Sequence, residues 1–237
     1  MLQRLRQIIG MRLGNKTGNN ARRSLWTDVR ALIRTEHPVI IDGGSNQGEL
    51  VDLLLNQYQH PRIYAIEANP DLAGRLREKF SQDDRVTVIP KALGSFNGVS
   101  DFHIAGNLYS SSVFARGVFN ERYHGTLTAF IKTISVPMVR LEKLVASEES
   151  IAVLKLDLEG SELAALQGAR ALLPKIKVIV TEVEFVDEYA GAPRFSELEM
   201  FLREHNFRLF NFYDCHTYPD GQLTTGDALF INNAHFP

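Results

Sequence analysis

Cysteine and long hydrophobic runs are the two features that this 237-residue sequence most clearly lacks. Cys215 is the only cysteine, which excludes a disulfide framework and any zinc site built from clustered cysteines. No run of about 18 apolar residues occurs, so no transmembrane helix is predicted. The first residues also lack the continuous apolar stretch of roughly 7–15 residues that a secretory signal requires. We therefore expect a cytoplasmic protein.

A net charge is also almost absent, but the near balance conceals an uneven distribution. The whole chain has a formal charge of −2, whereas residues 1–34 contain eight basic side chains and one acidic one, a net +7, and the remainder carries −9. Residues 1–13 have leucines and isoleucines at helical spacing with arginines between them, which predicts a short amphipathic helix. Peripheral contact of residues 1–13 with an anionic membrane is one explanation, and contact with a partner or packing on the domain are the others.

The composition is otherwise that of a folded globular protein. Hydrophobic residues make up 44% of the chain and charged residues 23%, which is enough apolar material for a packed core and suits one domain of this length. The pattern changes after His37, where a helical segment ends before a proline. We therefore expect a basic helical extension over residues 1–37 and a single domain over residues 38–237.

Strands and helices alternate from residue 38 onward. Short apolar segments predict strands at residues 39–42, 62–67, 86–89, 151–156 and 177–183. Helical patterns follow at residues 49–58, 71–80 and 162–173, and at a segment that Ser196 opens through a capping box with Glu199. This alternation predicts an α/β fold with a doubly wound, mostly parallel sheet. The end differs, because residues 207–213 and 227–231 predict two strands that pair antiparallel.

Residues 99–141 form a long insertion between the third and fourth predicted strands, rich in serine, glycine and aromatic residues. A long connection in a compact domain is usually functional or mobile. Tyr109, Ser110, Ser111 and Arg116 are the candidate substrate contacts within it. The alternative is a flexible polar loop.

A glycine-rich turn follows the first predicted strand, and residues 41–48 read Ile-Asp-Gly-Gly-Ser-Asn-Gln-Gly. Glycines let the backbone turn tightly and approach a ligand without a Cβ clash. The spacing departs from Gly-x-Gly-x-x-Gly, and Asp42 would repel the pyrophosphate of a dinucleotide but attract an amino group. The turn therefore favours a nucleotide that carries an amino acid over NAD. A purely structural turn is the alternative.

Glu67 ends the second predicted strand, 19 residues after Gly48. In nucleotide-binding α/β domains an acid at this place accepts hydrogen bonds from the ribose hydroxyls. Asp42 and Glu67, with the glycine-rich turn between them, predict S-adenosylmethionine as the ligand. Taken alone, Glu67 could equally be a solvent-exposed acid at a strand end.

Two acids follow the fourth predicted strand, near the point where strand order reverses and ligands bind. Asp157 and Glu159 are two residues apart and could face the same side of an extended chain. Either could deprotonate a substrate hydroxyl, or the pair could hold a divalent cation through carboxylate oxygens. The alternative is a helix cap, a role that we expect for Glu162. Glu182, at the end of the fifth predicted strand, is a further candidate base.

In this ordered set of motifs the chain resembles the FkbM-type S-adenosylmethionine-dependent methyltransferases, over roughly residues 38–232. The resemblance rests on residues 41–48, 66–70, 91–94, 110–112, 136–141, 155–162 with Gly168, and 180–184. It implies a class I methyltransferase fold, a seven-stranded sheet with an antiparallel last strand, and methylation of a hydroxyl oxygen, often on a sugar or natural product. Residues 43–45 and 141–143 depart from the family pattern, and no role is carried onto the latter.

The resemblance also implies a role for each motif. The glycine-rich turn would wrap the methionine part of the cofactor, Glu67 would hold the ribose, and the residue after the third strand would lie near the adenine. Asp157 and Glu159 would face the methyl group and the acceptor. The cofactor residues implied in this way are Asp42, Gly44, Ser45, Asn46, Gly48, Glu67, Ala68, Asn69, Ala92 and Asp157.

The sequence thus predicts an S-adenosylmethionine-dependent O-methyltransferase with a small-molecule or glycan acceptor and no nucleic acid partner. An NAD-dependent oxidoreductase is the first alternative, and the missing Gly-x-Gly-x-x-Gly argues against it. A membrane- or partner-binding protein that keeps the fold without activity is the second, and the intact Asp42 and Glu67 argue against that. The acceptor, the metal requirement and the oligomeric state are not determined by the sequence.

Overall fold

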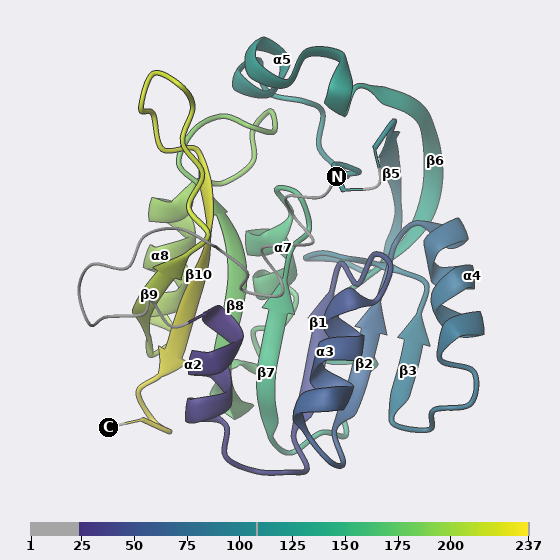
Figure 1. Cartoon of the computed structure of the whole chain (residues 1–237), viewed down its shortest axis with the longest axis vertical. Coiled ribbons are helices and arrows are strands. Elements are labelled where there is room, and N and C mark those ends of the chain that lie inside the picture. Colours follow the sequence, from purple (N-terminus) through teal and green to yellow (C-terminus); the bar gives the residue numbers. More distant parts are fainter. Residues whose placement is uncertain (1–23, 108, 237) are drawn as a thin grey trace, which may run out of the picture.

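The computed structural model describes residues 24–107 and 109–236, so the amphipathic helix predicted over residues 1–13 lies outside the described part. A seven-stranded sheet in the order β3-β2-β1-β7-β8-β10-β9 forms the centre of the molecule (Figure 1). Its strands are β1 (Val39–Gly43), β2 (Arg62–Ile66), β3 (Val86–Ile89), β7 (Ile151–Leu156), β8 (Ile176–Glu184), β9 (Phe207–Tyr213) and β10 (Thr225–Asn232).

The strand directions confirm the predicted fold class. β10 pairs antiparallel with both β8 and β9, and all other neighbours in this sheet are parallel. The chain runs outward from β1 to β3 and then returns to the other side of β1 as β7, so strand order reverses between β1 and β7. The carboxyl ends of these two strands therefore border the crevice in which ligands of such sheets bind.

Helices cover both faces of the sheet because neighbouring strand residues point to opposite sides. On one face lie α2 (Leu25–Leu32) and α3 (Glu49–Gln57), whose Val29 and Leu54 pack with Ile40 of β1. On the other lie α7 (Glu162–Gln167) and α8 (Phe195–Glu204), whose Leu166 and Leu202 share a core with Ile41. α4 (Pro70–Lys79) joins β2 to β3. Among the described residues no helix has the length and apolar character needed to cross a membrane.

Two predicted helix boundaries are wrong. The helix predicted over residues 162–173 ends at Gln167, and a short 3₁₀ turn, η2 (Leu173–Lys175), precedes β8. Gly168 passes so close to the neighbouring chain that a Cβ there would lie 2.1 Å from the carbonyl oxygen of Gly94. The last helix begins before Ser196, since Arg194 is its N-cap residue and Glu197 accepts the Arg194 N–H at 3.0 Å.

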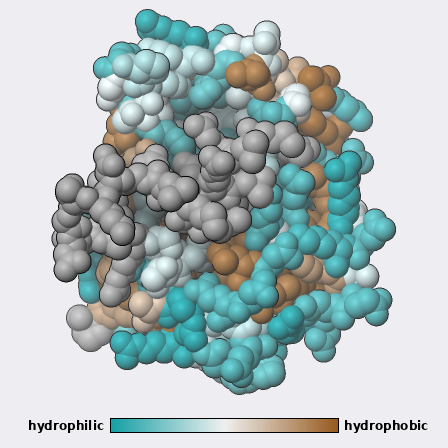
Figure 2. Space-filling view, viewed as in Figure 1, coloured by the Kyte–Doolittle hydropathy of each residue, from teal (hydrophilic) through white to brown (hydrophobic). Residues whose placement is uncertain are grey.

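The insertion is a folded unit. It contributes most of a second sheet, with the order β4-β6-β5, built from β4 (Ala92–Leu93), β5 (Gly98–Ala105) and β6 (Phe130–Val139). The short helices α5 (Val118–His124), η1 (Gly125–Thr128) and α6 (Leu141–Leu144) complete it. A small core that includes Phe102, Val136 and Met138 holds it together. Val118, Leu127 and Ile131 are exposed on it, and Figure 2 shows hydrophobic residues gathered over this part of the surface.

Candidate functional site

A cavity of about 250 Å³ opens at the carboxyl edge of the main sheet. The ends of β1, β2, β7 and β8 form its base, and α2, the insertion and the β9–β10 connection form its walls. The predicted site residues that line it are Asp42, Gly44, Ser45, Asn46, Glu67, Ala68, Asn69, Ala92, Tyr109, Ser111, Asp157, Glu159 and Glu182. Gly48, Ser110 and Arg116 do not line it.

The glycine-rich turn is held tightly against the end of β7. Gly44 has a φ of +77°, and a Cβ on it would lie 2.0 Å from the carbonyl oxygen of Asp157. Only glycine fits such a close approach at positive φ. The Asp157 N–H donates to the carbonyl of Gly43 at 3.1 Å, and the Ser45 hydroxyl donates to the carbonyl of Asp42 at 2.8 Å. The turn therefore presents its backbone to the cavity in one fixed arrangement.

Asp42 and Lys155 form a buried ion pair beneath this turn. The two residues are register partners on β1 and β7, and Lys155 Nζ lies 3.2 Å from Oδ1 of the fully buried Asp42. Neither Asp42 oxygen accepts a well-aligned hydrogen bond from the described residues. Burial lowers the pKa of Lys155, but Asp42 and Asp157 raise it by more, so the pKa of this ammonium lies above its ordinary value. Lys155 is therefore charged at neutral pH.

Glu67 is buried beside the turn and already anchors two backbone groups. Its Oε2 accepts the N–H of Asn46 and its Oε1 accepts the N–H of Asn69, both at 2.8 Å. Burial raises the pKa of this carboxyl, the two backbone hydrogen bonds lower it, and the net shift is upward. Each carboxylate oxygen has two lone pairs, so Glu67 can accept further hydrogen bonds from a ligand in the cavity.

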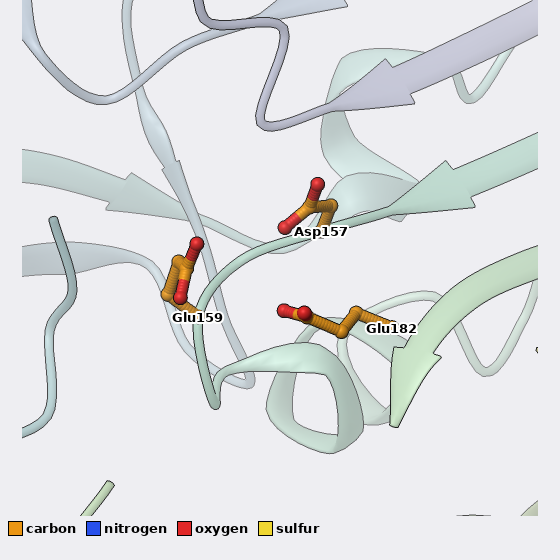
Figure 3. Close-up of side chains that lie close together, drawn as sticks. All are labelled: Asp157, Glu159 and Glu182. Atoms are coloured by element: carbon orange, nitrogen blue, oxygen red, sulfur yellow. The ribbon is translucent and has the colours of Figure 1, made fainter. Parts of the chain in front are cut away.

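Three carboxylate side chains lie close together beside the glycine-rich turn. One oxygen from each of Asp157, Glu159 and Glu182 lies within 4.8 Å of the others, and Figure 3 shows all three side chains turned toward a common space. Asp157 follows β7 and Glu182 lies near the end of β8, so the parallel pairing of these strands brings them together. We call these three residues the acid cluster. Their oxygens could hold a divalent cation or take a proton.

Partners from neighbouring elements restrain the acid cluster. The Tyr189 hydroxyl donates to Glu159 Oε2 at 2.6 Å, and Lys155 Nζ lies 3.7 Å from Asp157 Oδ2. Glu159 has a φ of 54°, the left-handed region that a side chain rarely adopts. Glu162 stabilises this bend, since its carboxylate accepts the N–H groups of Leu158 at 2.6 Å and Gly160 at 3.1 Å. Burial raises the pKa of Glu162 to about 7.

Of the four substrate contacts predicted within the insertion, two line the cavity and two do not. Tyr109 and Ser111 line the cavity, and Gln47 of the glycine-rich turn donates to the Tyr109 hydroxyl at 3.4 Å. Arg116 instead donates to Asn120 Oδ1 at 2.9 Å and to the carbonyl of Gly125, within the insertion itself. The Ser110 N–H donates to Asn107 Oδ1 at 2.9 Å.

Several residues that line the cavity are not among the predicted site residues. Lys155 belongs to one of the motifs of the resemblance but has no predicted role. A lysine within an apolar strand is the signal that marks it as a candidate site residue. No local pattern marks the remaining ones, because they come from distant segments that meet only in the fold. Among them are Ser24, Leu25 and Trp26 at the start of α2, Phe102 on β5, and Asp214, His216 and Asp227 of the terminal hairpin.

Comparison with protein families decides the class of this site. The family model described as the methyltransferase FkbM domain matches residues 42–209, a span that contains the glycine-rich turn, Glu67 and the acid cluster. The chain belongs to the FkbM methyltransferase family. The sequence-based resemblance is therefore confirmed, and the oxidoreductase and non-catalytic alternatives are wrong.

Two relatives of this FkbM chain have described activities. The 2-O-methyltransferase NoeI of Sinorhizobium fredii is 28% identical over 170 residues, which cover 69% of this chain and 70% of the relative. The hexuronic acid methyltransferase AglP of Haloferax volcanii is 32% identical over 161 residues, which cover 65% of this chain and 60% of the relative.

Solved structures of methyltransferases share the fold. A precorrin-6y C5,15-methyltransferase from Geobacter metallireducens matches with a TM-score of 0.50 and 12% identity, over 90% of each chain. An rRNA methylase from Streptococcus thermophilus matches with a TM-score of 0.51 and 11% identity, over 90% of this chain and 99% of the other. At this identity the likeness concerns the fold alone.

The cofactor of this methyltransferase is S-adenosylmethionine, and the residues of the cavity fit it. The cofactor carries a cationic amino group and sulfonium, and the buried Asp42 oxygens lack well-aligned donors among the described residues. Glu67 has spare lone pairs for the ribose hydroxyls, and Gly44 keeps the backbone of the turn free of a Cβ. Lys155 adds a constraint, since it competes for Asp42 with the amino group.

Proposed function

We propose that this chain transfers a methyl group from S-adenosylmethionine to a hydroxyl oxygen of a sugar or glycan. The acid cluster beside the glycine-rich turn carries this proposal, because a sugar hydroxyl is a weak nucleophile and needs a base as the new bond forms. The names of the two relatives support it, since one is a 2-O-methyltransferase and the other a hexuronic acid methyltransferase.

The donor would occupy the part of the cavity next to β1 and β2. Its methionine part would lie along the glycine-rich turn, with its amino group toward Asp42, and its ribose on Glu67. Ala68 and Asn69 would lie beside the ribose and Ala92 near the adenine, since all three residues line the cavity. Tyr109 and Ser111 of the insertion would contact the acceptor.

The acid cluster would move the proton. Bound S-adenosylmethionine supplies an electrophilic methyl group, and the chain's own residues orient the acceptor and accept its hydroxyl proton. Asp157 is the first candidate base, since its side chain is 44% exposed, toward the cavity that it lines. Glu159 is bound by Tyr189, which suits it to orient the acceptor. Glu182 completes the cluster as a second proton acceptor.

Donor binding and methyl transfer test the proposal separately. Calorimetry should detect S-adenosylhomocysteine binding to the purified protein and no binding of NADH. Transfer of a labelled methyl group should then occur to a member of a panel of neutral, amino and uronic acid glycosides. Binding without transfer to any glycoside would refute the sugar acceptor, and absence of binding would refute the donor site.

The acid cluster could instead hold a divalent cation, and chelation distinguishes the two roles. We expect transfer to continue in EDTA, because Lys155 and Tyr189 already compensate two of the three carboxylates. The measurement is the initial rate after EDTA treatment, with and without added Mg²⁺. A rate that falls in EDTA and returns with Mg²⁺ would assign the cluster to a cation.

A peripheral membrane contact of residues 1–13 is a separate part of the proposal. The helical spacing and the net +7 charge of residues 1–34 support it. The full chain should float with anionic vesicles at low salt and should be released at high salt. Equal flotation with anionic and neutral vesicles would refute this proposed membrane contact.

A further inference from the structure

Lys155 lies between the glycine-rich turn and the acid cluster. Its ammonium donates to the carbonyl of Gly44 at 3.0 Å and to that of Gly43 at 3.3 Å. It also lies 3.2 Å from Asp42 Oδ1 and 3.7 Å from Asp157 Oδ2. The two carbonyls accept two of the three N–H groups of this ammonium, and its charge pairs with that of Asp42. Lys155 lines the cavity, and the glycine-rich turn and Asp42 together hold its ammonium in place.

The contact between the glycine-rich turn and the end of β7 is tightly packed. Gly44 approaches the carbonyl of Asp157 so closely that no Cβ fits between them, and the Asp157 N–H bonds the carbonyl of Gly43. The Lys155 side chain is only 13% exposed. A change in the ammonium contacts would therefore shift the glycine-rich turn relative to Asp157.

We propose that Lys155 is a positioning residue. It holds the glycine-rich turn against β7 and so sets the distance between this turn and the acid cluster. This inference rests on the proposed methyl transfer. An in-line displacement is sensitive to alignment, and a misplacement of about 1 Å can cost about 100-fold in rate. Lys155 acts through the carbonyls of Gly43 and Gly44 and through Asp42, and it takes no part in the proton transfer.

The test compares Lys155→Met with a matched control, Lys175→Met. Lys175 is also partly buried and its ammonium donates to a backbone carbonyl, that of Glu148, at 3.0 Å, but it does not line the cavity. Calorimetry should show that Lys155→Met weakens S-adenosylhomocysteine binding at least tenfold. Lys175→Met should bind within twofold of the natural chain, and Lys155→Arg should recover part of the loss.

A merely structural role for Lys155 would consist in balancing the charge of Asp42. The double variant Asp42→Asn/Lys155→Met removes that charge, so its melting temperature should exceed that of Lys155→Met. Its affinity for S-adenosylhomocysteine should nevertheless stay at least fivefold below that of Asp42→Asn, because the carbonyls of the turn remain untied. Affinity equal to that of Asp42→Asn would overturn the positioning role, even where Lys155→Met alone fails to fold.

The outcomes separate this inference from the proposed function. If the natural chain does not bind S-adenosylhomocysteine, the donor site itself is refuted. If the natural chain binds it and Lys155→Met binds it equally well, only the inference on Lys155 is refuted. With an active glycoside, Lys155→Met should lower kcat and also raise the KM for the donor, whereas its KM for the acceptor should stay within twofold.

Discussion

At the scale of single residues, Asp157 connects the two halves of the cavity. Its backbone N–H and carbonyl contact the glycine-rich turn, and its carboxylate belongs to the acid cluster. Its backbone therefore supports the glycine-rich turn independently of its side chain. A substitution that keeps the shape of the side chain should separate these two contributions.

Asp157→Asn should reduce kcat about 100-fold, since it removes a general base but keeps the size of the side chain. Its affinity for S-adenosylhomocysteine should stay within about threefold, because the backbone contacts persist. Steady-state rates and calorimetry measure the two quantities. The exposed Asp84→Asn, outside the cavity, is the control. A loss of donor affinity as large as the loss of rate would contradict a base role for Asp157.

The buried carboxyl of Glu184 should make the stability of the fold depend on pH. It is buried, and burial raises its pKa to about 9, helped by Glu162, Glu159 and Glu188. The folded state therefore binds the Glu184 proton more tightly than the unfolded state does. Its contribution to stability is present below about pH 5 and is lost as pH rises toward about 9.

Glu184→Gln should remove this loss, since glutamine stays neutral at every pH. At pH 9 its melting temperature should exceed that of the natural chain by about 4–8 °C, the equivalent of about 2 kcal/mol. At pH 5 the two proteins should melt alike. Thermal melts at pH 5, 7 and 9 make the comparison. Parallel curves for the two proteins would show that another group controls the pH dependence.

At the scale of elements, three segments distant in sequence contact one another: the insertion, the segment after β8 and the β9–β10 connection. The ring of Tyr123 on α5 stacks on that of Tyr218 in the β9–β10 connection, with centroids 3.7 Å apart. The Tyr218 hydroxyl donates to Glu188, which follows β8, at 2.6 Å. The Gly117 N–H donates to the carbonyl of Glu188 at 2.7 Å. These contacts join the insertion to the terminal hairpin.

Tyr218→Phe should loosen this junction without touching the donor side. The ring stack persists, but the buried Glu188 loses its hydroxyl donor, which costs about 1 kcal/mol. We expect the KM for the acceptor to rise about fivefold and the affinity for S-adenosylhomocysteine to stay within twofold. Tyr64→Phe is the matched control, since that hydroxyl also donates to a buried acid, Glu148, at 2.6 Å. Equal effects of both variants on KM would contradict the assignment.

Element prediction succeeded where one periodicity governed the segment. The strands at residues 39–42 and 151–156 were predicted within a residue of their bounds, because they are short apolar runs between clear turns. The helix after Ser161 is shorter than predicted. The apolar spacing continues to residue 173, but the carbonyl of Gly168 accepts the Glu142 N–H at 3.2 Å and not a helical N–H. That contact is tertiary and leaves no local signal. The second sheet was missed for the same reason, since β4 and β6 pair across distant positions.

At the scale of the whole molecule, donor binding should stabilise the fold. S-adenosylhomocysteine at 100 times its Kd should contribute about 2.7 kcal/mol and raise the melting temperature by about 5–10 °C. NADH at the same concentration should leave the melting temperature unchanged. Trp26 is the single tryptophan and lines the cavity, so its fluorescence should report the same binding. Stabilisation by NADH would contradict the identity of the donor.

The sequence alone determined the order of strands and helices in the main sheet, its antiparallel ending, the family and the candidate acids Asp42, Glu67, Asp157 and Glu159. Each strand, helix and motif behind these predictions lies within one short segment, where spacing and turn chemistry carry the information. The tertiary structure alone decided that Lys155 pairs with Asp42, that Glu182 joins Asp157 and Glu159, and that α2 and the terminal hairpin wall the cavity. These contacts join segments far apart along the chain, and only the packing of strands and helices around one sheet brings their side chains within reach.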